Sequence, residues 1–295
     1  MEITGDIVEV RKAVSAARSE GKMIGFVPTM GSLHEGHISL VRAARRQTGF
    51  VVVSIFVNKL QFGPKEDFND YPRDLDTDKT LLRQGGCDLV FTPQASVMYP
   101  PGFVTSVQVA GLTEHLCGTS RPGHFNGVAT VVCKLFNIVA PDQAYFGLKD
   151  RQQLMIIERM TRNLDIPVTI VGMPIIRERD GLAMSSRNRY LNDKERKSAL
   201  CLGNSLKLAA RLVREGEKNT GIIIERMRNY ILDTSGVEPN YIAAVDGEEL
   251  RPVEQVELNT IFAIAANVGK SRLIDNMQVS EADLKIAEQH QAGGE

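Results

Sequence analysis

The stretch MIGFVPTMGSLHEGHISLVRAARRQTGFVVVSIFV, residues 23–57, decides how the first half of the chain folds. It opens on a short apolar run, MIGFV (23–27), and closes on a continuous β-branched and aromatic run, FVVVSIFV (50–57). Between them, HISLVRAARRQ (37–47) carries apolar residues at helical spacing. Continuous apolar runs are typical of strands covered on both faces, so the stretch predicts a strand–loop–helix–strand unit with parallel strands.

The same alternation continues towards residue 176. It predicts further strands at 88–91, 104–109, 143–147 and 167–171, and helices at 74–84, 126–139 and 151–163. This order is typical of an α/β fold with a Rossmann-like, doubly wound parallel sheet.

The pattern changes in the last third of the chain. Two charged amphipathic helices are expected at 193–216 and 219–233, followed by strands at 240–245 and 260–266. Helices followed by strands indicate a smaller C-terminal α+β domain. We therefore expect a first domain at 1–178 and a second at 179–295.

Composition excludes several classes of protein. The net charge is -1 with mixed acids and bases, which argues against a nucleic-acid groove or a membrane-surface patch. The N-terminus lacks an apolar signal segment, and no apolar run approaches the ~20 residues of a membrane span. The four cysteines form no CxxC pair, so a zinc knuckle or redox dithiol is not indicated. Buried free thiols and a cytoplasmic location are expected.

The loop PTMGSLHEGH (28–37) leaves the first predicted strand at its carboxyl end, where doubly wound sheets bind ligands. The helix that follows offers free N–H groups and a partial positive charge, both of which favour phosphate. His34 and His37 lie three residues apart, so one helical turn would place both on one side. Two imidazoles there can donate hydrogen bonds to phosphate oxygens as charge develops.

Two other interpretations fit the same letters. A pair of histidines can bind metal, but the metalloprotease pattern is HExxH rather than HxxH with an internal glycine. The pair can also be a helix cap and a surface residue. No GxxxxGK[ST] phosphate loop occurs in the chain.

The loop resembles the HxGH signature of the nucleotidyltransferase superfamily, in which the histidines contact ATP phosphates. Two later segments fit that superfamily. GLAMSSRN (181–188) resembles its KMSKS-type loop and offers hydroxyls and a guanidinium to a triphosphate. FGLKDRQQ (146–153) places Lys149 between a predicted strand and a predicted helix, with Asp150 as a candidate helix cap.

Ordered segments along nearly the whole chain are similar to the pantothenate synthetase family. They are VPTMGSLHEGH (27–37), VSIFVNKLQFGP (53–64), YPRDLDTD (71–78), SRPGHFNGVATVV (120–132), YFGLKDRQQ (145–153), DGLAMSSRN (180–188) and SRLIDN (271–276).

That resemblance implies an AMP-forming ligase with ATP, pantoate and β-alanine as substrates. The pantoate carboxylate attacks the α-phosphorus of Mg²⁺-bound ATP, giving pantoyl adenylate and pyrophosphate. The amine of β-alanine then expels AMP. Mg²⁺ is expected on the ATP phosphates rather than in a cage of protein ligands. The resemblance also implies a homodimer and a C-terminal domain that closes over ATP.

The resemblance assigns residues to these tasks. His37, His34 and Lys149 are the expected catalytic residues, while Gln61 is expected to bind pantoate and β-alanine, and Gln153 pantoate. Asn58 is a further candidate for substrate binding. The implied ATP-binding residues are Met30, Gly31, Ser32, Leu33, His34, Glu35, Gly36, His37, Gly147, Leu148, Lys149, Asp150, Ile176, Met184, Ser185, Ser186 and Arg187, with Ile176 expected at a strand end.

The segments 62–75 and 113–125 are candidate flaps, with Arg121 and His124 as gate residues rather than catalysts. The chain departs from the family at Lys59, where proline is usual, and at Asn267, where tryptophan is common. Lys59 puts in question the rigidity of the turn that carries Asn58 and Gln61.

Two other functions use the same features. An adenylyltransferase would employ both ATP loops and stop at a nucleotidyl product. A regulatory module would bind nucleotide without turnover.

Overall fold

The computed structural model describes residues 1–64 and 66–292 and divides the chain into two compact units. Unit 1 comprises residues 1–113 and 121–176, and unit 2 comprises residues 114–120 and the chain from residue 177 onwards. The division at 176/177 lies two residues before the expected boundary. The short segment 114–120, which the sequence interpretation left in the first domain, groups with unit 2.

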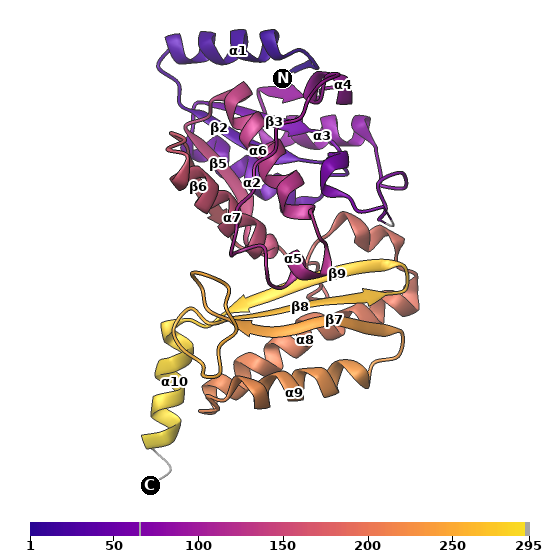
Figure 1. The fold of residues 1–295 in the computed structure, drawn as a ribbon, viewed down its shortest axis with the longest axis vertical. Coiled ribbons are helices and arrows are strands. Elements are labelled where there is room, and N and C mark those ends of the chain that lie inside the picture. Colours follow the sequence, from indigo (N-terminus) through magenta and orange to yellow (C-terminus); the bar gives the residue numbers. More distant parts are fainter. Residues whose placement is uncertain (65, 293–295) are drawn as a thin grey trace. The chain divides into compact units, whose positions relative to one another are not determined.

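Unit 1 is built on a six-stranded parallel sheet in the order β1-β4-β3-β2-β5-β6 (Figure 1). The predicted Rossmann-like α/β fold is thereby confirmed. The strands are β1 (Glu2–Thr4), β2 (Ile24–Thr29), β3 (Phe50–Ile55), β4 (Leu89–Phe91), β5 (Gln143–Gly147) and β6 (Thr169–Met173).

Helices cover this sheet and alternate with its strands along the chain. They are α1 (Ile7–Ser19), α2 (Glu35–Gln47), α3 (Leu75–Gly85), α4 (Ala95–Met98), α6 (His124–Val139) and α7 (Arg151–Asn163), with short 3₁₀ turns η1 (Lys59–Gln61) and η2 (Leu148–Asp150). The apolar side of α2, including Ile38 and Val41, packs with Val51 and Val53 of β3 in one buried cluster. Burial of this apolar area stabilises the unit that carries the His34–His37 loop.

One predicted strand of unit 1 is wrong. Residues 104–109 alternate in sequence but form no strand, and Val104 is 91% exposed. The backbone N–H of Val107 donates instead to the hydroxyl of Thr130 on α6, at 2.9 Å. A side-chain acceptor on a neighbouring helix thus replaces the strand partner that the alternation implied.

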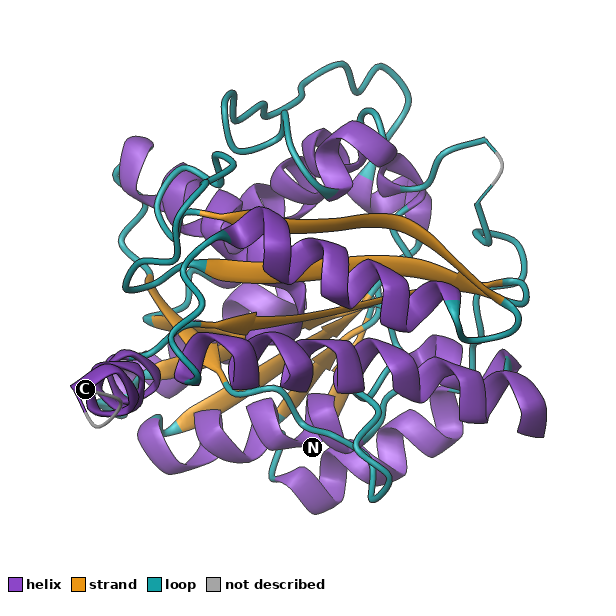
Figure 2. Ribbon diagram, turned by 90° about the horizontal axis from the view of Figure 1, so that it is seen from below, coloured by secondary structure: helices purple, strands orange, loops and turns teal. Residues whose placement is uncertain are grey.

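Unit 2 contains a three-stranded antiparallel sheet in the order β7-β8-β9. Its elements are η3 (Ser186–Tyr190), α8 (Asp193–Arg214), α9 (Thr220–Leu232), β7 (Val237–Val245), β8 (Ile261–Val268), β9 (Ser271–Gln278) and α10 (Glu281–Ala292). Figure 2 shows that long helices run beside the strands they cover. The predicted α+β character is confirmed, while β9 and α10 were not predicted.

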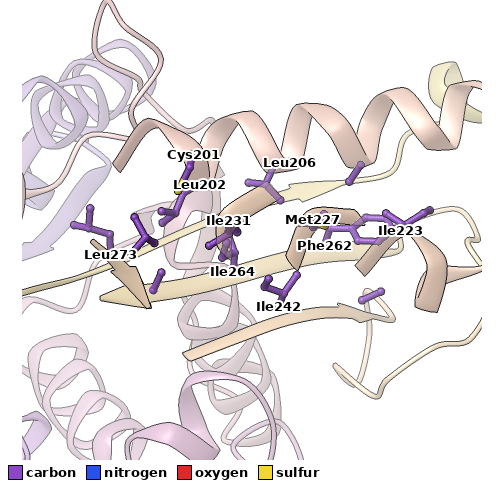
Figure 3. Close-up of a cluster of buried hydrophobic side chains, with 14 of the residues drawn as sticks. Cys201, Leu202, Leu206, Ile223, Met227, Ile231, Ile242, Phe262, Ile264 and Leu273 are labelled. Carbon is purple, nitrogen blue, oxygen red and sulfur yellow. The ribbon is translucent and has the colours of Figure 1, made fainter. Parts of the chain in front are cut away.

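The core of unit 2 lies between its sheet and the helices α8 and α9 (Figure 3). Leu202 and Leu206 from α8 meet Met227 from α9 and Phe262 and Ile264 from β8. The helical residues recur at spacings of three and four, which is the pattern that predicted these amphipathic helices.

The segment 114–120 is held to unit 2 by polar contacts. It contains the single-turn helix α5 (Cys117–Ser120). The thiol of Cys117 lies 3.2 Å from the hydroxyl of Tyr241 on β7, and the guanidinium of Arg272 on β9 donates to Ser120 Oγ at 3.1 Å. The chain therefore passes from unit 1 into unit 2 and back before α6 begins.

Candidate active site

The candidate site of unit 1 lies where the strand order of the sheet reverses. From β2, the chain continues to β3 on one side, whereas β5 pairs with the other side of β2. Such a reversal leaves a crevice beyond the carboxyl ends of the two central strands. The loops that leave these ends are residues 30–34 after β2 and residues 148–150 after β5. Both were expected to bind ATP.

The loop after β2 is shaped by a buried carboxylate. Gly31 and Ser32 adopt positive φ values of 82° and 51°. Asp78 of α3, only 2% exposed, accepts the backbone N–H of Ser32 at 2.9 Å and that of Leu33 at 2.7 Å. These charge-assisted bonds offset the cost of the left-handed backbone at Ser32. Sequence reasoning missed Asp78, although it ends the quoted YPRDLDTD segment.

His34 and His37 come together at the start of α2. His34 is the N-cap residue, and the two rings lie 4.1 Å apart between centroids. The backbone N–H of His34 faces Nδ1 of His37 at 3.4 Å. Since Nδ1 of His37 accepts there, its proton sits on Nε2.

Burial lowers the pKa of His37 well below its usual value, and the neighbouring His34 and Lys149 lower it further. The imidazole is therefore neutral at pH 7 and acts as a hydrogen-bond donor through Nε2–H rather than as a cation. Lys149 itself lies on η2, the short turn that follows β5.

Asp150 follows Lys149 at the N-cap position of α7, but its side chain makes no capping hydrogen bond. Its carboxylate lies 4.0 Å from Lys149 Nζ. Gln153 is half-buried on the first turn of α7. Its neighbour Gln152 is buried and donates to the carbonyl of Leu112 at 2.8 Å, so the two glutamines have different environments.

Asn58 and Gln61 lie on the turn that follows β3. Asn58 caps η1, with its Oδ1 accepting the N–H of Leu60 at 3.3 Å, and it also bonds the side chain of Gln61. Lys59 begins this 3₁₀ turn in place of the usual proline. The turn is held instead by these hydrogen bonds of the Asn58 side chain.

Arg121 and His124, the expected gate residues, hold the backbone of Gln61. His124 Nδ1 donates to the Gln61 carbonyl at 2.8 Å, and Arg121 donates to it at 3.3 Å. Arg121 also donates to Nε2 of His124 and forms an ion pair with Glu66. A carbonyl only accepts and a guanidinium only donates, so His124 is neutral with its proton on Nδ1. Burial and the Arg121 charge lower its pKa to about 4, in agreement.

The other predicted ATP loop belongs to unit 2. Ser185 caps η3 by accepting the N–H of Arg187 at 3.3 Å, and Ser186 is buried. Arg177, which precedes this loop in the chain, forms a two-point ion pair with Asp275 of β9, at 2.6 and 3.0 Å. Ile176, expected at a strand end, lies beyond β6, which ends at Met173.

Two further observations concern the described part of the chain as a whole. Within residues 1–64 and 66–292, no three His, Cys, Asp or Glu side chains gather into a metal-binding group. None of the helices described there combines the length and apolar character that a membrane crossing requires.

Comparison with known proteins identifies the family. The model of the pantoate-beta-alanine ligase family matches residues 2–278. A pantothenate synthetase of Moorella thermoacetica is 51% identical over 96% of this chain and its own full length, and one of Heliobacterium modesticaldum is 55% identical over 88% of this chain and 92% of its own.

Solved structures agree. A pantothenate synthetase from Thermus thermophilus superposes with a TM-score of 0.91 at 44% identity, covering 95% of this chain and 100% of that one. A pantoate-beta-alanine ligase from Francisella tularensis, complexed with beta-gamma ATP and β-alanine, superposes with a TM-score of 0.76 at 32% identity, covering 94% and 97%. The chain belongs to the pantoate–β-alanine ligase family.

Proposed function

We propose that this ligase activates pantoate on ATP at the His34–His37 loop and then passes the pantoyl group to β-alanine. One observation carries the proposal. His37, a buried and neutral histidine donor in the first turn of α2, and Lys149 of η2 follow the two strands, β2 and β5, at which the strand order of the α/β sheet reverses. Fixed donors at such a position suit a reaction in which negative charge moves onto phosphate oxygens.

In the first step, a carboxylate oxygen of pantoate attacks the α-phosphorus of ATP. A new oxygen–phosphorus bond forms, and the bond to the β-phosphate oxygen breaks, so pyrophosphate leaves with the electron pair. Nε2–H of His37 and Nζ of Lys149 would stabilise the charge on the phosphate oxygens. Neither group needs to transfer a proton in this step.

In the second step, the unprotonated amine of β-alanine attacks the acyl carbon of pantoyl adenylate. The carbon–nitrogen bond forms, AMP leaves with its phosphate oxygen, and the amine proton is lost. No covalent enzyme intermediate is required, since activation resides in the mixed anhydride. The protein's contributions are alignment of the reactants and exclusion of water.

The nucleotide would enter as its magnesium complex. Mg²⁺ prefers oxygen ligands and retains several waters, and the triphosphate offers such oxygens. We propose the loop Met30–His37, the turn Gly147–Asp150, Ile176 and the segment Met184–Arg187 as the ATP-binding residues.

The two glutamines are proposed to hold the acids, Gln153 for pantoate and Gln61 for both. Their amides can bond hydroxyl and carboxylate groups at once. Asn58 is 1% exposed and bonded within the protein, so the geometry favours support of Gln61 over direct substrate contact.

The setting of the enzyme is also a proposal. Its free cysteines, three of them buried, suit a reducing cytoplasm. A homodimer is proposed from the family, and sedimentation of the purified chain would measure it.

The test is an assay of AMP and pyrophosphate release in which pantoate and β-alanine are omitted in turn. We expect free AMP only when both are present. A stable adenylylated product would indicate an adenylyltransferase, and nucleotide binding without turnover would indicate a regulatory module.

His37→Ala and Lys149→Ala should each lower kcat by about two decades, the effect of losing one preorganised donor. The exposed Lys197→Ala on α8 serves as a control and should stay near the wild-type rate. Wild-type turnover in either site variant would remove that residue from the mechanism.

A further inference from the structure

Asn58 is the centre of a buried hydrogen-bond network beside Gln61. Its Oδ1 accepts the hydroxyl of Tyr99 at 2.7 Å and the backbone N–H of Leu60 at 3.3 Å. Its Nδ2 donates to the carbonyl of Gly127 on α6 and to Oε1 of Gln61, each at 3.0 Å. Both amide hydrogens of Asn58 are therefore engaged within the protein.

Backbone groups fix the orientation of the Asn58 amide. The N–H of Leu60 can only donate and the carbonyl of Gly127 can only accept, so the oxygen and nitrogen of Asn58 cannot exchange places. The second hydrogen on Nδ2 must then face an acceptor, which is Oε1 of Gln61. This turns Nε2 of Gln61 the other way, towards Met30 of the ATP loop, where Met30 Sδ lies at 3.2 Å.

Gly127 allows this network to close. A Cβ atom at this position would lie 2.3 Å from the carbonyl oxygen of Leu60 and 2.6 Å from the N of Gln61. Only glycine lets η1 approach α6 this closely. The close contact between η1 and α6 thus fixes the orientation of the Gln61 amide, that is, where its oxygen and its nitrogen point.

Tyr99 completes the network from the end of α4. Its ring packs against Phe56 and Phe103, with centroids 5.9 and 5.1 Å away. Burial raises the pKa of Tyr99, so the phenol stays protonated at physiological pH and its single proton is given to Asn58. The hydroxyl supplies the only side-chain donor that the described residues direct at Asn58 Oδ1.

We propose that Tyr99 is a positioning residue which, through Asn58, fixes Gln61 with its N–H groups towards the acid substrates. The inference rests on the proposed role of Gln61 in binding those acids. Gln61 then donates to a hydroxyl or carboxylate oxygen and disfavours a ligand that presents an ammonium group there. For β-alanine, the carboxylate faces Gln61 and the amine is left to point at the acyl carbon.

Tyr99→Phe tests this by deleting one hydroxyl while keeping the ring packing. We expect the KM for pantoate or β-alanine, or both, to rise by about fivefold, the effect of losing one neutral hydrogen bond. The KM for ATP should stay within about twofold, because Gln61 touches the ATP loop at Met30 Sδ, whereas the backbone of that loop is held by Asp78.

Tyr145→Phe is the matched control. It removes another buried phenol hydroxyl of unit 1, which bonds the side chains of Gln47 and Gln143. We expect no change in any KM. Equal effects in the two variants, or a rise in the KM for ATP as large as that for the acids, would overturn the inference.

A second variant reverses the polarity directly. Asn58→Asp puts an acceptor oxygen where Nδ2 stands, so the Gln61 amide must turn and present its oxygen to the acids. The KM for the acids should rise more than the roughly fivefold of Tyr99→Phe, with circular dichroism confirming the fold. Unchanged acid binding in the folded variant would refute the proposal. Absence of pantoate-dependent AMP release in the wild type would instead refute the proposed function.

Discussion

Two loops expected to meet ATP are supported in opposite ways. In unit 1, the loop after β2 is held through its backbone, since the buried Asp78 accepts the N–H groups of Ser32 and Leu33. In unit 2, the segment 177–188 is held by charged side chains. Arg177 pairs with Asp275, and Arg196 pairs with both Glu178 and Asp180.

The two kinds of support respond differently to ionic strength and to the loss of a partner side chain. Backbone N–H groups bound to one carboxylate fix a conformation without relying on long, charged side chains of the loop. Ion pairs between long side chains weaken as ionic strength rises, and each is lost when either partner is replaced. The first arrangement suits a loop whose backbone must stay fixed, and the second suits a loop whose position can be adjusted.

The largest expected effect is in unit 2. Asp275 is 2% exposed and Arg177 is 33% exposed, so Arg177→Ala leaves a buried carboxylate without its partner. We expect a loss of about 3–5 kcal/mol in the free energy of unfolding, measured by urea titration. Arg196→Ala is the control, because its partners are more exposed, and it should cost about 1 kcal/mol or less per pair. Equal losses of unfolding free energy in the two variants would show that the burial of Asp275 does not make its ion pair more stabilising than those of Arg196.

The next effect is on catalysis in unit 1. Asp78→Asn replaces one acceptor oxygen by an NH₂ group that faces a backbone N–H. The loop should shift, and kcat/KM for ATP should fall by about tenfold to a hundredfold, as expected for a small misplacement of catalytic groups. Steady-state kinetics with varied ATP would measure it.

Asp76→Asn provides the matched control for Asp78, since it lies on the same helix with a side chain 94% exposed. It should leave the kinetics unchanged. If Asp78→Asn also turned over like the wild type, the loop would owe its shape to something other than this carboxylate.

These two aspartates illustrate what sequence reasoning could and could not reach. The apolar runs of β2 and β3 predicted the parallel sheet, and the position of the His34–His37 loop followed from it. Asp78 lies 46 positions after Ser32 in the chain, and no local pattern indicated that its carboxylate turns inward. A contact of this kind depends on how α3 packs, which a single sequence does not contain.

Two other misses have the same cause. The alternation at 104–109 is the correct signal for a strand, but the partner of Val107 is the hydroxyl of Thr130 on a helix. The segment 114–120 has no composition that separates it from unit 1, and its place in unit 2 rests on contacts with Tyr241 and Arg272. Local pattern predicted most of the elements, though not β1, α1, β9 or α10, while the choice of partners was decided by tertiary structure.

The smallest expected effect is a pH dependence of stability. It arises from a histidine in unit 1 rather than from the ion pairs of unit 2. The support of Gln61 includes His124, whose pKa falls to about 4 through burial and the charge of Arg121. In the unfolded chain its pKa is about 6.5, so the unfolded state binds the proton first as the pH drops. The stability that neutral His124 contributes is complete above about pH 6.5 and is lost progressively down to about pH 4.

Between pH 7 and pH 5, this one group should reduce the free energy of unfolding by about 2 kcal/mol. His124→Gln removes the titrating group. Its free energy of unfolding should therefore fall by about 2 kcal/mol less than that of the wild type between pH 7 and pH 5, as measured by urea titration followed by circular dichroism. Added salt should change the His124 difference little, because the ring is largely buried, whereas the partly exposed Arg196 pairs should weaken. If added salt changed the His124 difference strongly, the support of Gln61 in unit 1 would depend on solvent-exposed charges, as the ion pairs of Arg196 in unit 2 do.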